Sequence, residues 1–222
     1  MLEASSILEE KNKELVNYLK THGYIKSPEV EKAFLETPRH LFVPENMLRY
    51  AYVNEPLPIG YGQTISQPSV VALMTELLSP KKGEKILEIG TGSGWQAAIL
   101  ARIVGDEGIV YTIERVRELA KFAKKNLEKL GIKSVRIICG DGSEGLKEYA
   151  PFDKIIYTAA VPKIPQFILD QLKKYGKIVA PVGKEDVQKM VVIEKIGKNK
   201  LKTTEYPGFF VFVPLKGKYG FK

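Results

Sequence analysis

The sequence predicts an α/β protein with a doubly wound, Rossmann-like sheet that is mostly parallel, antiparallel strands at its C-terminal edge, and an N-terminal helical region. Two observations predict this class. Strand and helix patterns alternate between residues 83 and 185, and a glycine-rich loop directly follows a buried-strand pattern at residues 84–89. We expect one compact unit with three regions: residues 1–80, an α/β core at 81–185, and edge strands at 186–222.

The N-terminal region is expected to be helical. Apolar residues recur there between charged ones at roughly helical spacing, at Leu2, Ile7, Leu8, Leu15 and Leu19. A second helix should begin with Ser27 as its N-cap and Pro28 at its first position. The amphipathic stretch at residues 5–20 could pack on the chain's own core or on a second subunit. The sequence therefore allows a monomer or a homo-oligomer formed through this helix.

The central region should alternate strands with crossover helices. The expected strands are 84–89, 108–113, 134–139, 153–158 and 176–181. The expected helices are 95–104, 116–130, a short one near 143–148, and 165–174. After residue 186, antiparallel strands are expected at 190–195, 203–206 and 209–213.

Composition limits the classes of protein. No run of about 18 apolar residues occurs, which predicts no transmembrane helix. The N-terminus has no apolar signal-peptide segment. The single cysteine, Cys139, lies in an apolar strand pattern, which predicts a buried thiol in a reducing, cytoplasmic compartment. One cysteine and two histidines are too few for a structural zinc cluster, so no metal site is predicted.

The glycine loop indicates the type of cofactor. Residues 87–95 read Leu-Glu-Ile-Gly-Thr-Gly-Ser-Gly-Trp, with glycines at 90, 92 and 94. A dinucleotide fingerprint would need its third glycine where Trp95 stands, and no Gly-Lys-Ser/Thr of a P-loop follows. The segment instead resembles motif I of class I S-adenosylmethionine-dependent methyltransferases, Glu/Asp-x-Gly-x-Gly-x-Gly. A turn without a ligand is the alternative.

Acidic residues end the next two strand patterns. Glu114 lies 20 residues after Gly94, where an acid can accept hydrogen bonds from both hydroxyls of a ribose. Asp141 could accept from an adenine amino group beside Gly142, although an ordinary Asp-Gly turn is the alternative. For S-adenosylmethionine, the resemblance implies that Gly90–Gly94 cradles the methionine part and that Glu88 meets its ammonium group. The further candidate cofactor contacts are Thr64, Gln67, Thr91 and Thr158.

The segment before the core indicates the substrate. No Asp/Asn-Pro-Pro-Tyr/Phe follows the fourth strand, and Cys139 is not placed to attack a pyrimidine. Residues 56–72, Pro-Leu-Pro-Ile-Gly-Tyr-Gly-Gln-Thr-Ile-Ser-Gln-Pro-Ser-Val-Val-Ala, closely resemble the signature of protein L-isoaspartate O-methyltransferases. Further matches bring the resemblance to about residues 28–216. It implies methylation of the abnormal carboxylate of isoaspartyl residues in damaged proteins, with S-adenosylhomocysteine as the second product.

The resemblance also implies a substrate site. Ser66 takes the active-site serine position, and Thr64, Ile65 and Val213 are expected to bind an extended peptide. The alternative for Ser66 is a helix N-cap before Pro68. A carboxylate is ionised at neutral pH, so catalysis needs alignment rather than a base.

Two rival functions remain from the sequence. One is an RNA methyltransferase on the same fold, which the net charge of +8 favours, although the lysines are scattered among glutamates. The other is a non-catalytic cofactor-binding protein. We expect no specific nucleic acid and no membrane among the partners.

Overall fold

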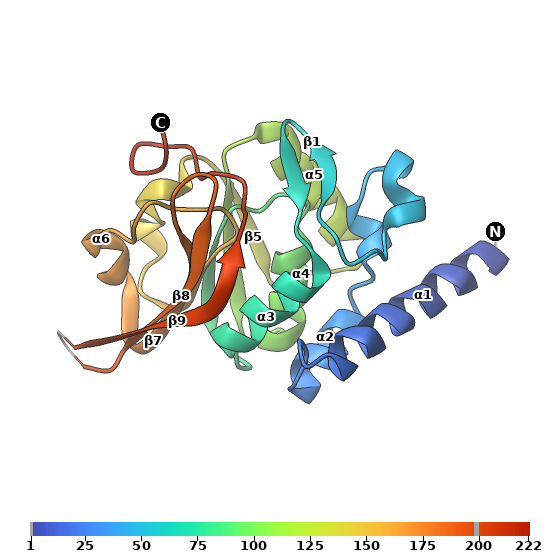
Figure 1. Cartoon of the computed structure of the whole chain (residues 1–222), viewed down its shortest axis with the longest axis horizontal. Coiled ribbons are helices and arrows are strands. Elements are labelled where there is room, and N and C mark those ends of the chain that lie inside the picture. The colour runs from blue at the N-terminus through green and yellow to red at the C-terminus, as the bar shows by residue number, and fades with distance from the viewer. Residues whose placement is uncertain (1, 198–199) are drawn as a thin grey trace.

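The structure is a computed structural model that describes residues 2–197 and 200–222 (Figure 1). Its centre is a seven-stranded sheet of order β5-β4-β3-β6-β7-β8-β9. Strands β3 to β7 are parallel, and β8 and β9 extend the β7 edge in antiparallel fashion. The strands are β3 (Lys85–Ile89), β4 (Ile109–Glu114), β5 (Val135–Cys139), β6 (Phe152–Tyr157), β7 (Leu172–Gly183), β8 (Gln188–Lys195) and β9 (Leu201–Phe210). The predicted fold class is confirmed.

Both faces of the central strands are apolar, so both are covered. Along β3, Ile86 packs with side chains of α3 and α4, whereas Leu87 and Ile89 belong to the core on the opposite face, with α6. The helices of this region are α3 (Pro68–Leu78), α4 (Trp95–Val104), α5 (Arg117–Lys129) and α6 (Gln166–Leu169), with 3₁₀ turns η3 (Gly142–Glu144) and η4 (Lys147–Tyr149).

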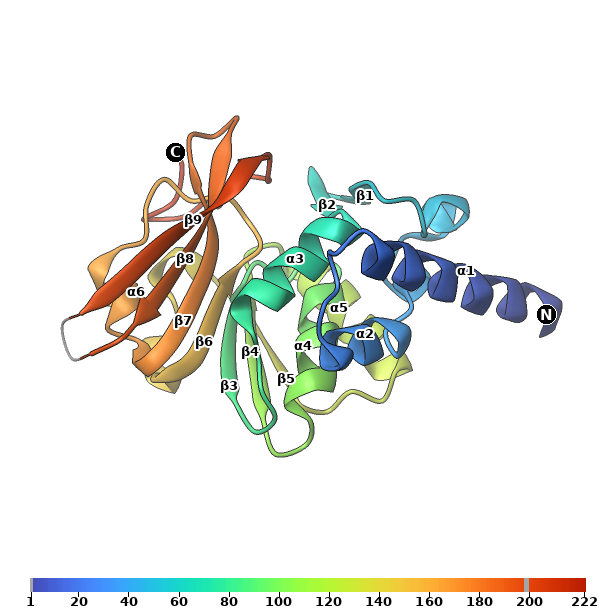
Figure 2. The same cartoon turned by 60° about the horizontal axis from the view of Figure 1, so that its bottom comes forward.

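The N-terminal region packs beside α4. It comprises α1 (Leu2–Thr21), α2 (Pro28–Leu35), the 3₁₀ turns η1 (Arg39–Phe42) and η2 (Glu45–Tyr50), and a hairpin of β1 (Leu57–Gly60) and β2 (Gln63–Ile65). Leu15, Val16 and Leu19 of α1 are buried in the chain's own core. Figure 2 shows the first turns of α1 extending away from the rest of the molecule. Assembly through this helix stays a prediction.

The strand order places the functional loops together. β3 lies between β4 and β6, so the connections leaving the sheet diverge at its carboxyl end. Ligands of open α/β sheets bind at such a switch point. Glu88 stands beside Thr112 of β4 in register, and Ile89 pairs with Tyr157 of β6. The loop after β3 therefore faces the ends of both neighbours.

Some predicted boundaries were wrong. The helix expected at 165–174 ends at Leu169, because Leu172 already pairs with Phe152 as the first residue of β7. The two expected strands 203–206 and 209–213 are a single strand that ends at Phe210. A register shift near Gln188 accommodates the longer pairing. The short helix near 143–148 is two separate 3₁₀ turns, η3 and η4.

The environment of Cys139 was also predicted wrongly. Its thiol is exposed rather than buried. Cys139 is the last residue of β5, which is the outer strand of the sheet and has β4 on one side only. In the part of the chain that is described, no helix has the length and apolarity needed to cross a membrane.

Candidate active site

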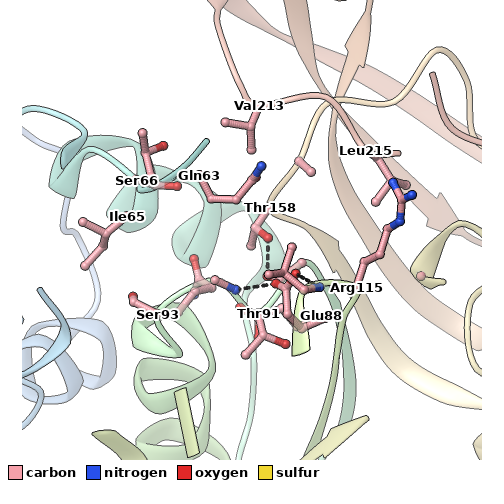
Figure 3. Close-up of a pocket in the computed structure, with 18 of the residues that line it drawn as sticks. Gln63, Ile65, Ser66, Glu88, Thr91, Ser93, Arg115, Thr158, Val213 and Leu215 are labelled. Atoms are coloured by element: carbon pink, nitrogen blue, oxygen red, sulfur yellow. Dashed lines mark hydrogen bonds between the residues drawn. The ribbon is translucent and has the colours of Figure 1, made fainter. Parts of the chain in front are cut away.

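A cavity lies at the carboxyl end of the sheet, between the loop after β3, the β2–α3 segment and the segment that follows β9 (Figure 3). Most of the predicted site residues line it. These are Thr64, Ile65, Ser66, Glu88, Gly90, Thr91, Gly92, Glu114, Gly142, Thr158 and Val213. The structure therefore brings residues from six segments of the chain to one place.

Glu88 is a buried acid in this cavity. Its side chain has no exposed surface, and its Oε2 accepts a hydrogen bond of 2.5 Å from the Thr112 hydroxyl. Its Oε1 is buried and has no partner. Burial raises the pKa of Glu88 to about 8, and the Thr112 hydroxyl opposes this rise. An unpartnered carboxylate oxygen in a cavity wall is an acceptor for a cationic group of a ligand.

The loop after β3 has a backbone that only glycine adopts readily. Gly90 has φ +100°, and a Cβ there would collide with the hydroxyl of Thr158. That hydroxyl donates to the carbonyls of Ile89, at 3.1 Å, and Gly90. Thr91 is tied to Thr112 by a hydroxyl contact of 2.6 Å. The loop is thus held against both neighbouring strands while its backbone stays open toward the cavity.

Glu114 ends β4 on the same side. Its Oε2 accepts from the Gly92 amide at 2.9 Å, and its Oε1 accepts from the Val116 amide at 2.9 Å. Each oxygen keeps a second lone pair. Glu114 is therefore fixed in orientation against the glycine loop and still able to accept hydrogen bonds from vicinal hydroxyls of a ligand.

Ser66 and its neighbours form the opposite wall. Ile65 ends β2, and Ser66 connects it to the N-cap of α3. The N-cap is Gln67, so the capping alternative for Ser66 was wrong. Figure 3 shows Ser66 and Ile65 on the side of the cavity away from Glu88, with Val213 above them. The wall at Ser66 carries hydroxyl and apolar groups and the amide of Gln63, but among the described lining residues 63–66 it has no acid or histidine.

Three predicted cofactor residues do not line this cavity. Gln67 lines a neighbouring hollow instead. Gly94 is the N-cap of α4 and faces α5, where a Cβ would come within 3.1 Å of the Ala123 Cβ. It permits close helix packing rather than approach of a ligand.

Asp141 is the third. Its Oδ1 accepts from the Ser143 amide at 2.9 Å and its Oδ2 from the Lys218 amide at 2.8 Å. Partial burial would raise its pKa, but these hydrogen bonds hold the pKa below its usual value. Asp141 therefore anchors the C-terminal segment beside the cavity, and Gly142 is the residue of this pair that reaches the wall.

The residues present fit S-adenosylmethionine. The free Oε1 of Glu88 suits its ammonium group, Glu114 suits its ribose hydroxyls, and Gly90 and Gly92 present backbone without side chains to the cavity. Among the described residues, no group of three or more His, Cys, Asp and Glu side chains is placed to hold a metal ion.

Sequence reasoning missed several lining residues. Ser93, Gln96, Arg115, Val116, Leu215 and Lys216 also contribute to the wall. Their positions depend on how α4, β4 and the C-terminal segment pack, and no local motif marks them. Trp95 is buried, and its indole NH donates to the Thr37 carbonyl at 3.0 Å. It also touches the cavity.

Comparison with known proteins shows the family to which this chain is similar. Residues 10–220 match the sequence model of the family described as protein-L-isoaspartate(D-aspartate) O-methyltransferase. The protein-L-isoaspartate O-methyltransferase of Staphylothermus marinus is 48% identical over 223 residues, covering 98% of this chain and 99% of that protein.

Solved structures agree. One protein-L-isoaspartate O-methyltransferase has 34% identity and a TM-score of 0.85, covering 94% of this chain and 67% of that chain. A structure described under the same activity from Plasmodium falciparum, in complex with S-adenosyl-L-homocysteine, has 26% identity and a TM-score of 0.80, covering 92% of this chain and 98% of that one. The resemblance inferred from the sequence is thus confirmed, and the chain belongs to the protein-L-isoaspartate (D-aspartate) O-methyltransferase family.

Proposed function

We propose that this chain transfers a methyl group from S-adenosylmethionine to the free carboxylate of L-isoaspartyl residues in damaged proteins and peptides. One observation carries the proposal beyond family membership. The cavity has an acidic side at Glu88 and Glu114. On the opposite side, the lining residues 63–66 offer hydroxyl, amide and apolar groups but no acid, histidine or lysine. Such a site suits a nucleophile that is already ionised.

The two sides of the cavity hold different reactants. When bound, S-adenosylmethionine supplies a methyl group on a sulfonium, which a carboxylate oxygen can accept without proton transfer. Glu88 and Glu114 hold the cofactor from the side of the sheet. The hydroxyls of Ser66 and Thr64 donate to the substrate carboxylate and orient it without neutralising it. Catalysis by these residues is alignment of two reactants.

A hollow that adjoins the cavity offers a binding site for the peptide. It shares Thr64, Ser66, Thr158 and Val213 with the cavity and continues along Phe209 to Phe212. The side chains of Phe209 and Val211 are 73% and 78% exposed. We propose that an extended peptide lies here, held largely through its backbone, because a repair enzyme must accept many flanking sequences. Methylating one backbone amide next to the isoaspartate should slow turnover, and unchanged turnover would contradict this mode of binding.

The test of function uses methyl-labelled S-adenosylmethionine with two matched peptides, one containing L-isoaspartate and one normal aspartate. Base-labile label should appear on the isoaspartyl peptide alone. Ser66→Ala should bind S-adenosylhomocysteine like the wild type but lower kcat, by roughly 10²-fold if alignment is lost. Label on neither peptide despite tight cofactor binding would refute the proposal and direct attention to RNA. Binding to RNA with a steep salt dependence would then be expected.

The cellular location stays part of the proposal. A cytoplasmic, reducing compartment is supported by the low cysteine content, with Cys139 as the single cysteine of the chain.

A further inference from the structure

Arg39 is a buried arginine held entirely by backbone carbonyls. It begins η1 and has no exposed surface. Its Nη1 donates to the carbonyls of Ala51 at 2.9 Å and Val53 at 3.1 Å, and its Nη2 donates to those of Glu55 at 2.8 Å and Ser66 at 3.1 Å. Within residues 2–197 and 200–222, no ion pair joins Arg39 to an acid.

A buried guanidinium without an acid is costly to keep. Burial lowers the pKa of Arg39 to about 9, so the group still carries its charge at neutral pH. Its Nε is buried and has no partner. Apolar residues would fill this position at lower cost. An arginine at this position is explained by the backbone segments that its donors join. Its planar guanidinium has five N–H donors and reaches several diverging carbonyls, which no neutral side chain can do.

The four carbonyls belong to two separate segments. Three lie in residues 51–55, between η2 and β1, and the fourth is the carbonyl of Ser66 between β2 and α3. The segment before Ser66 turns through positive φ at Gly60, Tyr61 and Gly62, at 93°, 54° and 69°. Arg39 is the side chain that fixes the peptide of Ser66 relative to the body of the N-terminal region.

The guanidinium of Arg39 also contacts Trp95, which lines the cavity next to the glycine loop. Its carbon lies 5.3 Å from the centroid of the Trp95 ring. Trp95 begins α4, lines the cavity, and is itself anchored to the Thr37 carbonyl. Arg39 thus lies between the Ser66 peptide and a ring that belongs to the wall next to the glycine loop.

We propose that Arg39 is a positioning residue for methyl transfer, because it fixes the Ser66 peptide against Trp95 and so sets the hydroxyl of Ser66 relative to the cofactor side of the cavity. The inference rests on the proposed role of Ser66 in holding the substrate carboxylate. Arg39 lines neither the cavity nor the adjoining hollow, and its effect passes through the Ser66 peptide, because Trp95 is also held by the Thr37 carbonyl. Its effect should therefore fall on turnover of the isoaspartyl peptide and not on cofactor affinity.

The test is a double-mutant cycle of Arg39→Lys and Ser66→Ala, with isoaspartyl peptide kinetics and calorimetric binding of S-adenosylhomocysteine. Lysine keeps the cation but cannot reach four diverging carbonyls. Arg39→Lys should lower kcat/KM by roughly 10- to 100-fold, the scale of a misplacement of about 1 Å, with cofactor affinity within about threefold of wild type. In the Ser66→Ala background the same change should cost less than about twofold, because coupled sites are not additive.

A matched control is Asn12→Ala. Asn12 is also buried and its amide also donates to backbone carbonyls, but these are the carbonyls of Phe34 and Leu35 and not that of Ser66. This variant should lose stability and keep kcat/KM. If Arg39→Lys does not fold, Arg39→Gln replaces it in the cycle, since it leaves no charge to bury.

Folded Arg39→Lys with wild-type kcat/KM, or effects that add in the cycle, would overturn the inference. A loss of cofactor affinity equal to the loss of kcat/KM would overturn it as well. The wild-type enzyme separates this failure from a failure of the proposed function. If the wild type does not methylate the isoaspartyl peptide, the function is wrong, whereas an active wild type with an equally active Arg39→Lys refutes only the role of Arg39.

Discussion

The pH dependence of stability should report the burial of Glu88. Glu88 has no exposed surface, one of its oxygens is bonded only to the Thr112 hydroxyl, and the other has no partner. Folding therefore favours the neutral acid over the carboxylate. Replacing Glu88 by glutamine imitates the neutral acid, since the amide oxygen can still accept from Thr112 and no charge is buried.

The magnitude follows from the two pKa values. The pKa of Glu88 is about 8 in the fold, against 4.5 for an ordinary glutamate. Between these values the folded state holds a proton that the unfolded chain has released, so the free energy of unfolding falls as the pH rises through this window. Each pKa unit corresponds to about 1.4 kcal/mol. The full cost of ionised Glu88 above pH 8 is therefore about 5 kcal/mol, comparable with the whole stability of a small domain.

The assay is urea unfolding of wild type and Glu88→Gln at pH 5, 6.5 and 8.5, without cofactor. The free energy of unfolding of the wild type should fall relative to the variant by several kcal/mol across this range. Burial also lowers the pKa of His40, but His40 is present in both proteins and its contribution cancels in the difference. Parallel pH curves for the two proteins would show that Glu88 ionises freely in the fold and would refute the reasoning.

Three further predictions follow. Gly90→Ala should weaken binding of S-adenosylhomocysteine at least tenfold by calorimetry, because its φ is +100° and its Cβ would displace the Thr158 hydroxyl. Gly94→Ala should instead lower the free energy of unfolding by roughly 1–3 kcal/mol through crowding of Ala123 at φ +86°, with a smaller effect on that affinity. Deleting residues 1–10 should change stability by less than about 1 kcal/mol, because from Ser6 onward, where burial in α1 is described, the buried positions begin at Asn12. Light scattering of the same deletion tests assembly, and a fall in particle mass would show that the N-terminal helix joins subunits.

The parts of the site that could be predicted are those in which one local pattern sets both conformation and chemistry. Gly90 and Gly92 after β3 are such a case, because the turn that glycine permits is also the turn that places backbone on the cavity wall. Glu88 and Glu114 could be predicted because parallel strands bring their carboxyl ends to one edge. Ser66 could be placed by family resemblance but not by physical reasoning, since its position next to a helix start fits an N-cap equally well.

Local patterns failed where a distant segment competes for the same group. Asp141 stands at the strand end where an adenine contact was expected, yet amides of Ser143 and of Lys218, 77 residues later in the chain, occupy its oxygens. Cys139 has an apolar neighbourhood in sequence but lies on an edge that no further strand covers. In each case the local pattern was read correctly and the tertiary arrangement decided the outcome.

Arg39 shows why the supporting residues of a site are the hardest to predict. Its four carbonyl partners lie 12 to 27 residues away in the sequence. Every residue has a backbone carbonyl, so no sequence motif marks these contacts. The signal becomes visible only when a cation is found buried with no acid beside it. Glu88 is the opposite case, because it is an acid buried with no cation beside it. Because burying an ionisable group without a partner of opposite charge lowers stability, each of the two indicates a residue kept for the site and not for the fold. We propose that Glu88 is kept to bind a cationic group of the ligand and that Arg39 is kept to fix the position of Ser66.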